Sequence, residues 1–232
     1  MDILKTANVP DLDVQRKCAR VVRHVRLSET GYELVLERNG LVFDAGRLIT
    51  LHGRDVTEDR SYTIASGERD EHLHILYRYV PAGVLTPQLI RLREGDTIEL
   101  SGPYGQFVLR DPKRPIWFIA TGTGVAPCHA YIRTHPSLDL TLVHGVRTED
   151  DLFYRADFAR YTYHPCLSKE RKSSCHFGHV TDHLAACDLP AEAHYYLCGA
   201  YEMIYDVQAL LLEKGITPDR IFVEGYYYRL ET

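Results

Sequence analysis

The stretch IWFIATGTGVAPCHAYIR, residues 116–133, decides the fold of the second half of this 232-residue chain. Its apolar start predicts a buried strand, and the pattern that begins near Val125 to Pro127 predicts a helix. Gly122 and Gly124 stand in the turn between them, where glycine lets the backbone approach a pyrophosphate and the helix start offers unpaired N–H groups. The turn therefore suits a dinucleotide. Pro127 replaces the third glycine of GxGxxG, however, and such a turn is often only a tight strand-to-helix connection.

Strands and helices continue to alternate after this stretch. Apolar runs at 138–145 and 194–199 alternate with helical patterns at 151–161 and 201–215. This alternation predicts a parallel sheet covered on both faces, as in a doubly wound nucleotide-binding domain. Ligands of such sheets bind outside the carboxyl ends of the strands. The residues expected to line this crevice are Gly145, Arg147, Cys198 and Gly199, and a buried core thiol is the alternative role of the cysteine.

The first half has a different hydrophobic pattern, with short alternating apolar runs separated by Gly, Asn or Asp. These runs lie at residues 16–27, 31–40, 48–53, 61–67, 72–80 and 96–102. They predict antiparallel strands that close a barrel. Segment 86–95 interrupts them as one short helix, with Thr86 as its N-cap and Pro87 at its first position. Because proline weakens both sheet and helix, the stretch 112–115 marks the boundary between the two halves.

Composition excludes several classes of protein. With 45% hydrophobic and 25% charged residues the chain has material for real cores, and its net charge of -5 argues against bulk nucleic-acid binding. No run is long and apolar enough for a membrane span, and the start, MDILKTANVP, lacks the features of a signal peptide, so we expect a cytoplasmic protein. The six cysteines are scattered and the twelve histidines show no metal-ligand spacing, so we expect reduced thiols, no iron–sulfur centre and no metal.

Five motifs stand in a distinctive order along the chain. They are Arg60-Ser61-Tyr62-Thr63, VPAGVLTPQL at 80–89, GPYGQF at 102–107, TGTGVAP at 121–127 and CGAYEM at 198–203. Their content and order resemble the ferredoxin–NADP reductase family, from about Cys18 to Tyr228. The resemblance implies an antiparallel FAD-binding barrel, residues 1–112, followed by a doubly wound NAD(P)-binding domain, residues 113–232, with the flavin in the cleft between them.

By this resemblance, the barrel half binds FAD. Arg60 forks onto the diphosphate, the Tyr62 ring covers the flavin face, and the Thr63 hydroxyl lies beside flavin N5. The alternative for such a strand is a solvated edge with an aromatic packing partner. The other candidates here are Ser61 of the same motif, Arg78 and Tyr79 beside the flavin, and Gly83, Val84, Leu85 and Thr86 at the pyrophosphate. Capping of its own helix is the alternative for the Thr86 hydroxyl, and both roles can hold at once.

The end of the chain, RIFVEGYYYRLET, resembles the family's closing strand. The resemblance implies that Glu224 is a charge or proton-relay partner and that the Tyr226 ring covers the isoalloxazine until nicotinamide displaces it. The chain runs on past the aromatic residue at which the plant-type pattern stops, so Tyr227 and Tyr228 are alternatives for the stacking ring. A tyrosine cluster at a chain end is otherwise most often a packing surface between domains.

The resemblance also places the nicotinamide dinucleotide. Cys198 lies near the nicotinamide ring, and the other contacts are Thr121, Gly122, Thr123, Gly124, Pro127, Arg147 and Gly199. Ser168 and Lys169 stand where the family carries a Ser-Arg pair for the 2′-phosphate of NADP, with Arg171 and Lys172 close by. Lysine is a point charge rather than a fork, and a solvated charged loop is the alternative. We expect NADPH, with NADH use left open.

These assignments predict a flavoprotein reductase in which Thr63, Cys198 and Glu224 surround the hydride path. Hydride passes from NADPH to flavin N5, and electrons then leave singly to a ferredoxin or flavodoxin. A basic docking patch for that carrier is expected at Arg91, Arg93, Arg110, Lys113 and Arg114, with a solvated face as the alternative. Two rival functions remain. One is a reductase component of an oxygenase or another multi-subunit redox enzyme, and many such relatives carry an iron–sulfur domain that the cysteines exclude here. The other is a non-catalytic flavin- or nucleotide-binding module.

Overall fold

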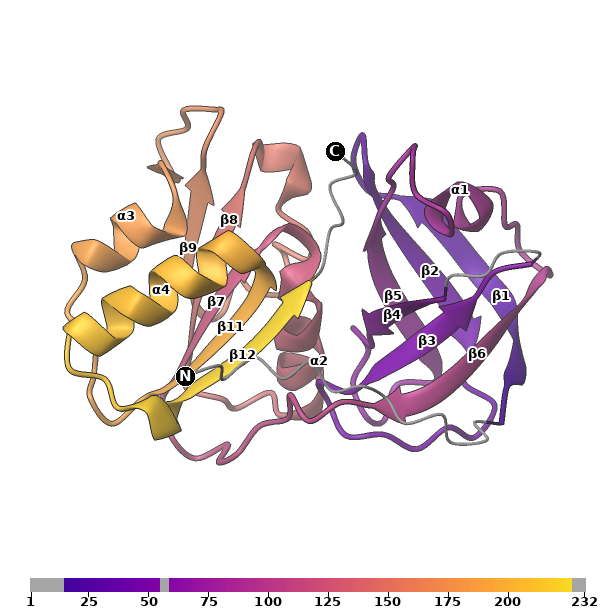
Figure 1. The fold of residues 1–232 in the computed structure, drawn as a ribbon, viewed down its shortest axis with the longest axis horizontal. Coiled ribbons are helices and arrows are strands. Elements are labelled where there is room, and N and C mark those ends of the chain that lie inside the picture. The colour runs from indigo at the N-terminus through magenta and orange to yellow at the C-terminus, as the bar shows by residue number, and fades with distance from the viewer. Residues whose placement is uncertain (1–14, 55–58, 227–232) are drawn as a thin grey trace.

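The computed structural model describes residues 15–54 and 59–226 and arranges them as two domains that lie side by side (Figure 1). The first domain holds strands β1 (Lys17–Arg26), β2 (Gly31–Glu37), β3 (Leu48–His52), β4 (Arg60–Thr63), β5 (His72–Arg78) and β6 (Thr97–Tyr104), with helix α1 (Thr86–Leu89). The linker from β6 to the second domain spans residues 105–115, and the expected division between residues 112 and 113 falls within it.

The first domain is the antiparallel barrel that the alternating pattern predicts. Its strands follow the order β4-β3-β6-β1-β2-β5, and each neighbouring pair is antiparallel. A single antiparallel bridge between Ile64 and Ile75 joins the two end strands and closes the barrel. Every second side chain faces inward, so Leu34 and Leu36 of β2 lie in the barrel core while Glu33 beside them faces outward.

The expected N-cap of α1 is wrong. Leu85 occupies the N-cap position without a side-chain hydrogen bond, and Thr86 is the first helical residue. The Thr86 hydroxyl instead accepts a hydrogen bond from the Val80 N–H and donates one to the Val80 carbonyl, both at 3.0 Å. It therefore closes the loop before the helix, which explains why it cannot cap the helix start as well.

The second domain is a six-stranded parallel sheet with helices on both faces, as predicted. Its strands are β7 (Ile116–Thr121), β8 (Leu140–Val146), β9 (Thr162–Leu167), β10 (His176–Phe177), β11 (His194–Ala200) and β12 (Ile221–Tyr226). Its helices are α2 (Ala126–Thr134), α3 (Val180–Ala185) and α4 (Tyr201–Glu213), with short 3-10 turns at Gly122–Val125, Glu149–Asp151 and Pro218–Arg220. The order β10-β9-β8-β7-β11-β12 puts the topological switch point between β7 and β11.

The two faces of this sheet bury different partners. Phe118 and Ala120 of β7 pack against α2, whereas Ile119 between them packs against α3 and α4. Helix α2 lies between the sheet and the barrel (Figure 1). The core around α2 therefore continues into the first domain at Leu76 and into the linker, where the Phe107 carbonyl accepts a hydrogen bond from the Tyr131 hydroxyl at 2.6 Å. Apolar burial thus joins the two domains.

The helix expected at residues 151–161 is wrong. The chain forms a 3-10 turn at Glu149–Asp151 and then successive turns up to residue 160. Tyr154 has a φ of 58°, in the left-handed region, which interrupts any right-handed helix at this point. The contacts that hold Tyr154 in this conformation come from both domains, and they are described below.

Candidate functional site

A cavity of about 650 Å³ lies at the carboxyl ends of the strands of the second domain, beside the switch point. Eight of the expected binding residues line it, namely Arg78, Thr121, Gly122, Thr123, Gly145, Arg147, Ser168 and Lys169, whereas Gly124, Cys198 and Gly199 are not among its lining residues. The barrel supplies one wall through Arg78 and the β1–β2 turn, residues 28–30. The cavity is therefore shared by both domains, and the contribution of residues 28–30 was not anticipated from the sequence.

The glycines of the two cavity-floor turns have distinct roles. Gly122 has a φ of 52° and open space where a Cβ would stand, which leaves its backbone accessible. A Cβ on Gly124 would overlap the Cys198 carbonyl, and one on Gly199 would overlap the Thr121 hydroxyl. That hydroxyl accepts a hydrogen bond from the Ala200 N–H at 2.9 Å. The turn after β7 and the turn after β11 are thus interlocked.

His144 on β8 supports the turn after β7 by a hydrogen bond to its backbone. Its Nε2 lies 2.9 Å from the Gly122 carbonyl, which can only accept, so Nε2 carries the proton. Nδ1 then accepts from the Tyr163 hydroxyl at 3.2 Å. Burial lowers the pKa of His144 to about 4, which keeps the ring neutral. This residue was not expected from the sequence, where its signal was a polar side chain inside an apolar strand. Pro127 lies buried in the first turn of α2 and does not line the cavity.

The cations expected at the end of the third strand of this domain, β9, divide into two groups. Lys172 forms ion pairs with Glu149 at 3.3 Å and Glu170 at 3.0 Å, and Arg171 covers the Phe177 ring at 3.9 Å. Arg147 and Lys169 line the cavity and form no side-chain ion pair among the described residues. The cavity is also lined by carboxylates that were not expected from the sequence, at Glu29, Asp150, Asp151, Glu202 and Asp206.

The three residues expected around the hydride path lie together at the contact between the domains. Thr63, at the end of β4, donates through Oγ1 to Oε2 of Glu224 on β12 at 2.9 Å. The Tyr226 hydroxyl lies 3.1 Å from the same Oγ1 and must donate to it, because the single Thr63 proton is already used. Cys198 pairs in register with Glu224 across β11 and β12, and its thiol reaches Tyr226.

Burial sets the electrostatics of this cluster. It raises the pKa of Glu224 to about 7, against a smaller lowering by the Thr63 hydrogen bond. Burial also raises the pKa values of the Cys198 thiol and the Tyr226 hydroxyl well above their ordinary ranges. Glu224 is thus the member of the cluster that exchanges protons near neutral pH. The alternative stacking residues Tyr227 and Tyr228 lie outside the described residues.

The expected flavin-binding residues lie on β4, at the end of β5 and in the loop before α1. Arg60 is exposed, Ser61 beside it bonds Thr50 at 2.9 Å, and the half-buried Tyr62 ring meets Tyr77 edge-on at 6.3 Å. Tyr79 packs edge-on against Tyr32, and the turn of Gly83, Val84 and Leu85 precedes α1 with the valine 40% exposed. A guanidinium, an accessible ring and a tight turn fit a flavin nucleotide. The Thr86 hydroxyl, already bonded twice to Val80, adds no free donor.

Family comparisons agree with this geometry. A family model described as "Oxidoreductase FAD-binding domain" matches residues 19–109, and one described as "Oxidoreductase NAD-binding domain" matches residues 118–209. The anthranilate 1,2-dioxygenase electron transfer component of Acinetobacter baylyi is 32% identical over 90% of this chain and 67% of its own length. The chain belongs to the ferredoxin–NADP reductase family. It is an FAD- and NAD-binding oxidoreductase by family, and the expected two-domain fold is confirmed.

Two further family members are similar over most of the chain. The toluate 1,2-dioxygenase electron transfer component of Pseudomonas putida is 29% identical over 87% of this chain and 65% of its own length. The crystal structure of the Amycolatopsis cytochrome P450 reductase GcoB superposes with a TM-score of 0.82 at 28% identity, covering 95% of this chain and 73% of that one. The chain thus spans about two thirds of the length of the two dioxygenase components.

In this family member the expected basic docking patch is not one surface. Arg110 stacks over Phe222 at 5.7 Å and Arg114 bonds the Glu192 carbonyl at 3.4 Å, so the linker cations, Lys113 among them, border the second domain. Arg91 and Arg93 follow α1 at the far end of the barrel (Figure 1). The patch is therefore two separate groups of cations.

Two negative findings apply to residues 15–54 and 59–226. No helix there has the length and apolar character to cross a membrane. No group of three or more His, Cys, Asp or Glu side chains in those ranges is arranged to hold a metal ion.

Proposed function

We propose that this chain is an FAD-dependent reductase that takes hydride from NADPH and supplies single electrons to an iron–sulfur carrier, a ferredoxin, of an oxygenase system. The observation that carries the proposal is the cluster of Thr63, Glu224, Tyr226 and Cys198, which joins the two domains. The expected flavin face and the dinucleotide cavity belong to these same two domains, and Arg78 lines the cavity.

The residues that fit FAD act mainly by binding and orientation. Arg60 would offer a fork for the diphosphate, the Tyr62 ring would cover the flavin face, and the turn before α1 would approach the nucleotide. Bound FAD supplies the chemistry of accepting a hydride and releasing electrons one at a time. The chain positions the reacting rings and excludes water from them.

Glu224 holds or releases a proton in this mechanism. When the carboxylate is ionised, Thr63 donates to it and Tyr226 donates to Thr63, which orients the Thr63 lone pair and proton. When Glu224 is protonated, it becomes a donor and the direction of the chain can reverse. A carboxyl group with a pKa of about 7 makes this exchange near neutral pH. The small Cys198 thiol packs beside Tyr226, where nicotinamide is expected.

NADPH is preferred in this proposal because two cations of the cavity form no ion pair with any side chain of residues 15–54 and 59–226. Arg147 and Lys169 line the cavity at the strand ends where the adenosine half of the dinucleotide is expected, and both can meet a 2′-phosphate. Lys172 is held by two glutamates and does not compete for the phosphate. The carboxylates of the same cavity would suit the ribose hydroxyls of NADH, which makes the choice a direct subject for experiment.

The carrier is proposed from the relatives. Two of them are electron transfer components of dioxygenases, and a similar structure is a cytochrome P450 reductase. A ferredoxin suits this role, and a flavodoxin is the alternative carrier.

The visible absorption spectrum of the purified protein tests the proposal first. We expect a flavin spectrum that anaerobic NADPH bleaches at lower concentration than NADH does, and reoxidation by an added ferredoxin. Replacing Lys169→Ala should raise the KM for NADPH about tenfold, the cost of one charge-assisted hydrogen bond, and leave the KM for NADH unchanged. A colourless protein that does not take up added FAD would overturn the proposal and favour a nucleotide-binding module without flavin chemistry.

A further inference from the structure

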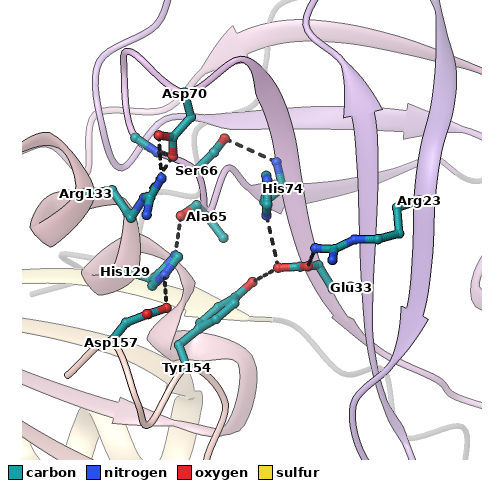
Figure 2. Close-up of polar contacts among 11 residues, drawn as sticks. Arg23, Glu33, Ala65, Ser66, Asp70, His74, His129, Arg133, Tyr154 and Asp157 are labelled. Atoms are coloured by element: carbon teal, nitrogen blue, oxygen red, sulfur yellow. Dashed lines mark hydrogen bonds and ion pairs between the residues drawn. The ribbon is translucent and has the colours of Figure 1, made fainter. Parts of the chain in front are cut away.

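Residues 148–158, which we call the bracing segment, connect β8 to β9 and extend from the second domain onto the barrel (Figure 2). Most of them belong to the pattern that predicts a helix, yet Tyr154 adopts a left-handed conformation. Such a conformation costs a bulky residue about 1 to 3 kcal/mol and persists only where surrounding contacts hold it. The contacts of Tyr154 therefore point to a role for this segment.

The Tyr154 hydroxyl enters a charged site on the barrel. It donates at 2.8 Å to Glu33, which faces out of β2 yet is only 5% exposed because the second domain covers it. His74 donates to the same carboxylate oxygen at 3.1 Å, and Arg23 donates to the other oxygen at 3.1 Å. Figure 2 shows these three donors converging on Glu33 from both domains. The phenol thus completes a fully partnered buried anion.

The Tyr154 ring is fixed from its own side by α2. It stacks on the His129 ring with centroids 3.8 Å apart and an interplanar angle of 13°. His129 lies 2.7 Å from the Ala65 carbonyl through Nδ1 and 2.9 Å from Asp157 through Nε2. Because both partners accept only, both ring nitrogens donate in this arrangement. His129 thereby ties the bracing segment, through Asp157, to the barrel backbone (Figure 2).

The start of the bracing segment is also a wall of the dinucleotide cavity. Asp151 accepts a hydrogen bond from the Ser28 hydroxyl at 2.7 Å, and the Phe153 ring fills the space where Gly31 lacks a Cβ. Ser28, Asp151 and Phe153 all line the cavity. Phe153 of this segment therefore forms part of the cavity wall, and the next residue, Tyr154, forms the contact that fixes the barrel against the second domain.

We propose that the bracing segment sets the width of the dinucleotide cavity and that Tyr154 is a positioning residue for dinucleotide binding. With the brace intact, the barrel wall at Ser28 and Arg78 stands at a fixed distance from the strand ends. Without the Tyr154–Glu33 hydrogen bond the two domains sample wider separations. The fraction of molecules whose cavity can bind the dinucleotide then falls, and the apparent dissociation constant for the dinucleotide rises. The inference rests on the proposed function, because it takes the cavity to be the dinucleotide site.

Tyr154→Phe tests this inference, because it removes the hydroxyl and keeps the ring that stacks on His129. We expect the dissociation constant for NADP⁺, measured by isothermal titration calorimetry on the FAD-loaded protein, to rise about fivefold, the lower end of usual coupling between sites. Tyr161→Phe is the matched control. It removes a phenol that bonds the Pro136 carbonyl at 3.0 Å within the second domain, and it should leave NADP⁺ binding unchanged.

A second control separates bracing by this segment from general loosening of the domains. Arg133→Ala removes an interdomain ion pair with Asp70 that lies outside the bracing segment and the cavity lining, and it should leave NADP⁺ affinity within about twofold of the wild type. Linkage also requires that NADP⁺ slow amide exchange at residues 153–157 of the wild type. The slowing should be absent in Tyr154→Phe.

The outcomes are distinct. Unchanged NADP⁺ affinity in Tyr154→Phe, or equal losses in Tyr154→Phe and Arg133→Ala, would overturn the inference while the proposed function stands. A wild-type protein that binds neither NADP⁺ nor NAD⁺ would overturn the proposed function itself. Absence of NADP⁺-dependent protection at residues 153–157 of the wild type would overturn the inference without reference to any variant.

Discussion

Glu33 is a buried glutamate and Glu224 a half-buried one, both at the contact between the two domains, and their environments shift their pKa values in opposite directions. Burial raises the pKa of Glu33, but donors from His74 and Tyr154 and the charge of Arg23 outweigh it and leave that pKa below its ordinary value. For Glu224 the effect of burial is opposed only by the hydrogen bond from the Thr63 hydroxyl, and the pKa of Glu224 rises to about 7. The set of donors, rather than the depth of burial, decides the charge state.

The difference separates a structural carboxylate from a chemical one. Glu33 stays ionised, and its partners come from both domains, so its charge holds the two domains together. Glu224 lies beside Thr63 and Tyr226, and among the described residues it has no cationic partner, so it changes protonation near neutral pH. A carboxylate that must exchange a proton is left with few donors, and one that must hold an interface is saturated with them.

Replacing Glu33→Ala should have the largest effect of the predictions that follow. Tyr154 and His74 would lose their buried acceptor, so we expect the free energy of unfolding to fall by about 3 kcal/mol in urea denaturation. Glu37→Ala, on the same strand, is the control, because Glu37 pairs with Arg20 at 3.7 Å with both side chains exposed. It should cost less than about 0.5 kcal/mol. Equal losses in the two variants would contradict the role of Glu33.

Glu224→Gln should have the next effect, with the opposite sign. Between pH 4.5 and about 7 the folded state retains a proton on Glu224 that the unfolded state has released, so stability falls as pH rises through this window. The variant removes this dependence of stability on pH. We expect its free energy of unfolding to exceed that of the wild type by about 2 kcal/mol at pH 8 and to equal that of the wild type near pH 4. Urea denaturation at the two pH values measures this, and an unchanged pH dependence in the variant would show that Glu224 is not the group responsible.

Asp70→Asn should have the smallest effect, since its interdomain pair is partly exposed. Arg133 donates to both Asp70 oxygens, at 3.1 and 2.7 Å, with the two side chains 49% and 21% exposed. We expect a loss of about 0.5 to 1 kcal/mol that shrinks at high salt, because solvent screens such a pair. Urea denaturation at low and high ionic strength checks it. A loss as large as that of Glu33→Ala would break the distinction between exposed and buried interdomain carboxylates.

Local patterns predict most of this fold. Each alternating run of the first half forms a strand, and the turn at Thr121 to Val125 lies where the glycines indicate. These features depend on neighbours in sequence, namely the two-residue alternation of a strand and the backbone freedom of glycine. The cluster of Thr63, Cys198 and Glu224 came from the family resemblance, because no local pattern relates residues so far apart.

The predictions that were wrong concern residues whose conformation depends on contacts with residues elsewhere in the chain. Residues 151–161 have a helical pattern, but Tyr154 is held by Glu33, a residue 121 positions away, and tertiary contact overrides local propensity. Thr86 resembles a cap by composition, yet its hydroxyl is used by Val80. Glu33 itself reads as a solvent-facing charge on an alternating strand. Only the second domain, which covers that face, makes it buried.

The interlocked turns after β7 and β11 have a consequence for recombining this protein with its relatives. A Cβ on Gly124 would overlap the Cys198 carbonyl, and one on Gly199 would overlap the Thr121 hydroxyl, which also accepts a hydrogen bond from the Ala200 N–H. A crossover placed between these two turns would pair surfaces that were selected in different chains. A larger fraction of chimeras should fold when residues 119–127 and 197–201 are exchanged together than when either turn is exchanged alone. The two turns therefore form one unit of inheritance despite their separation along the chain.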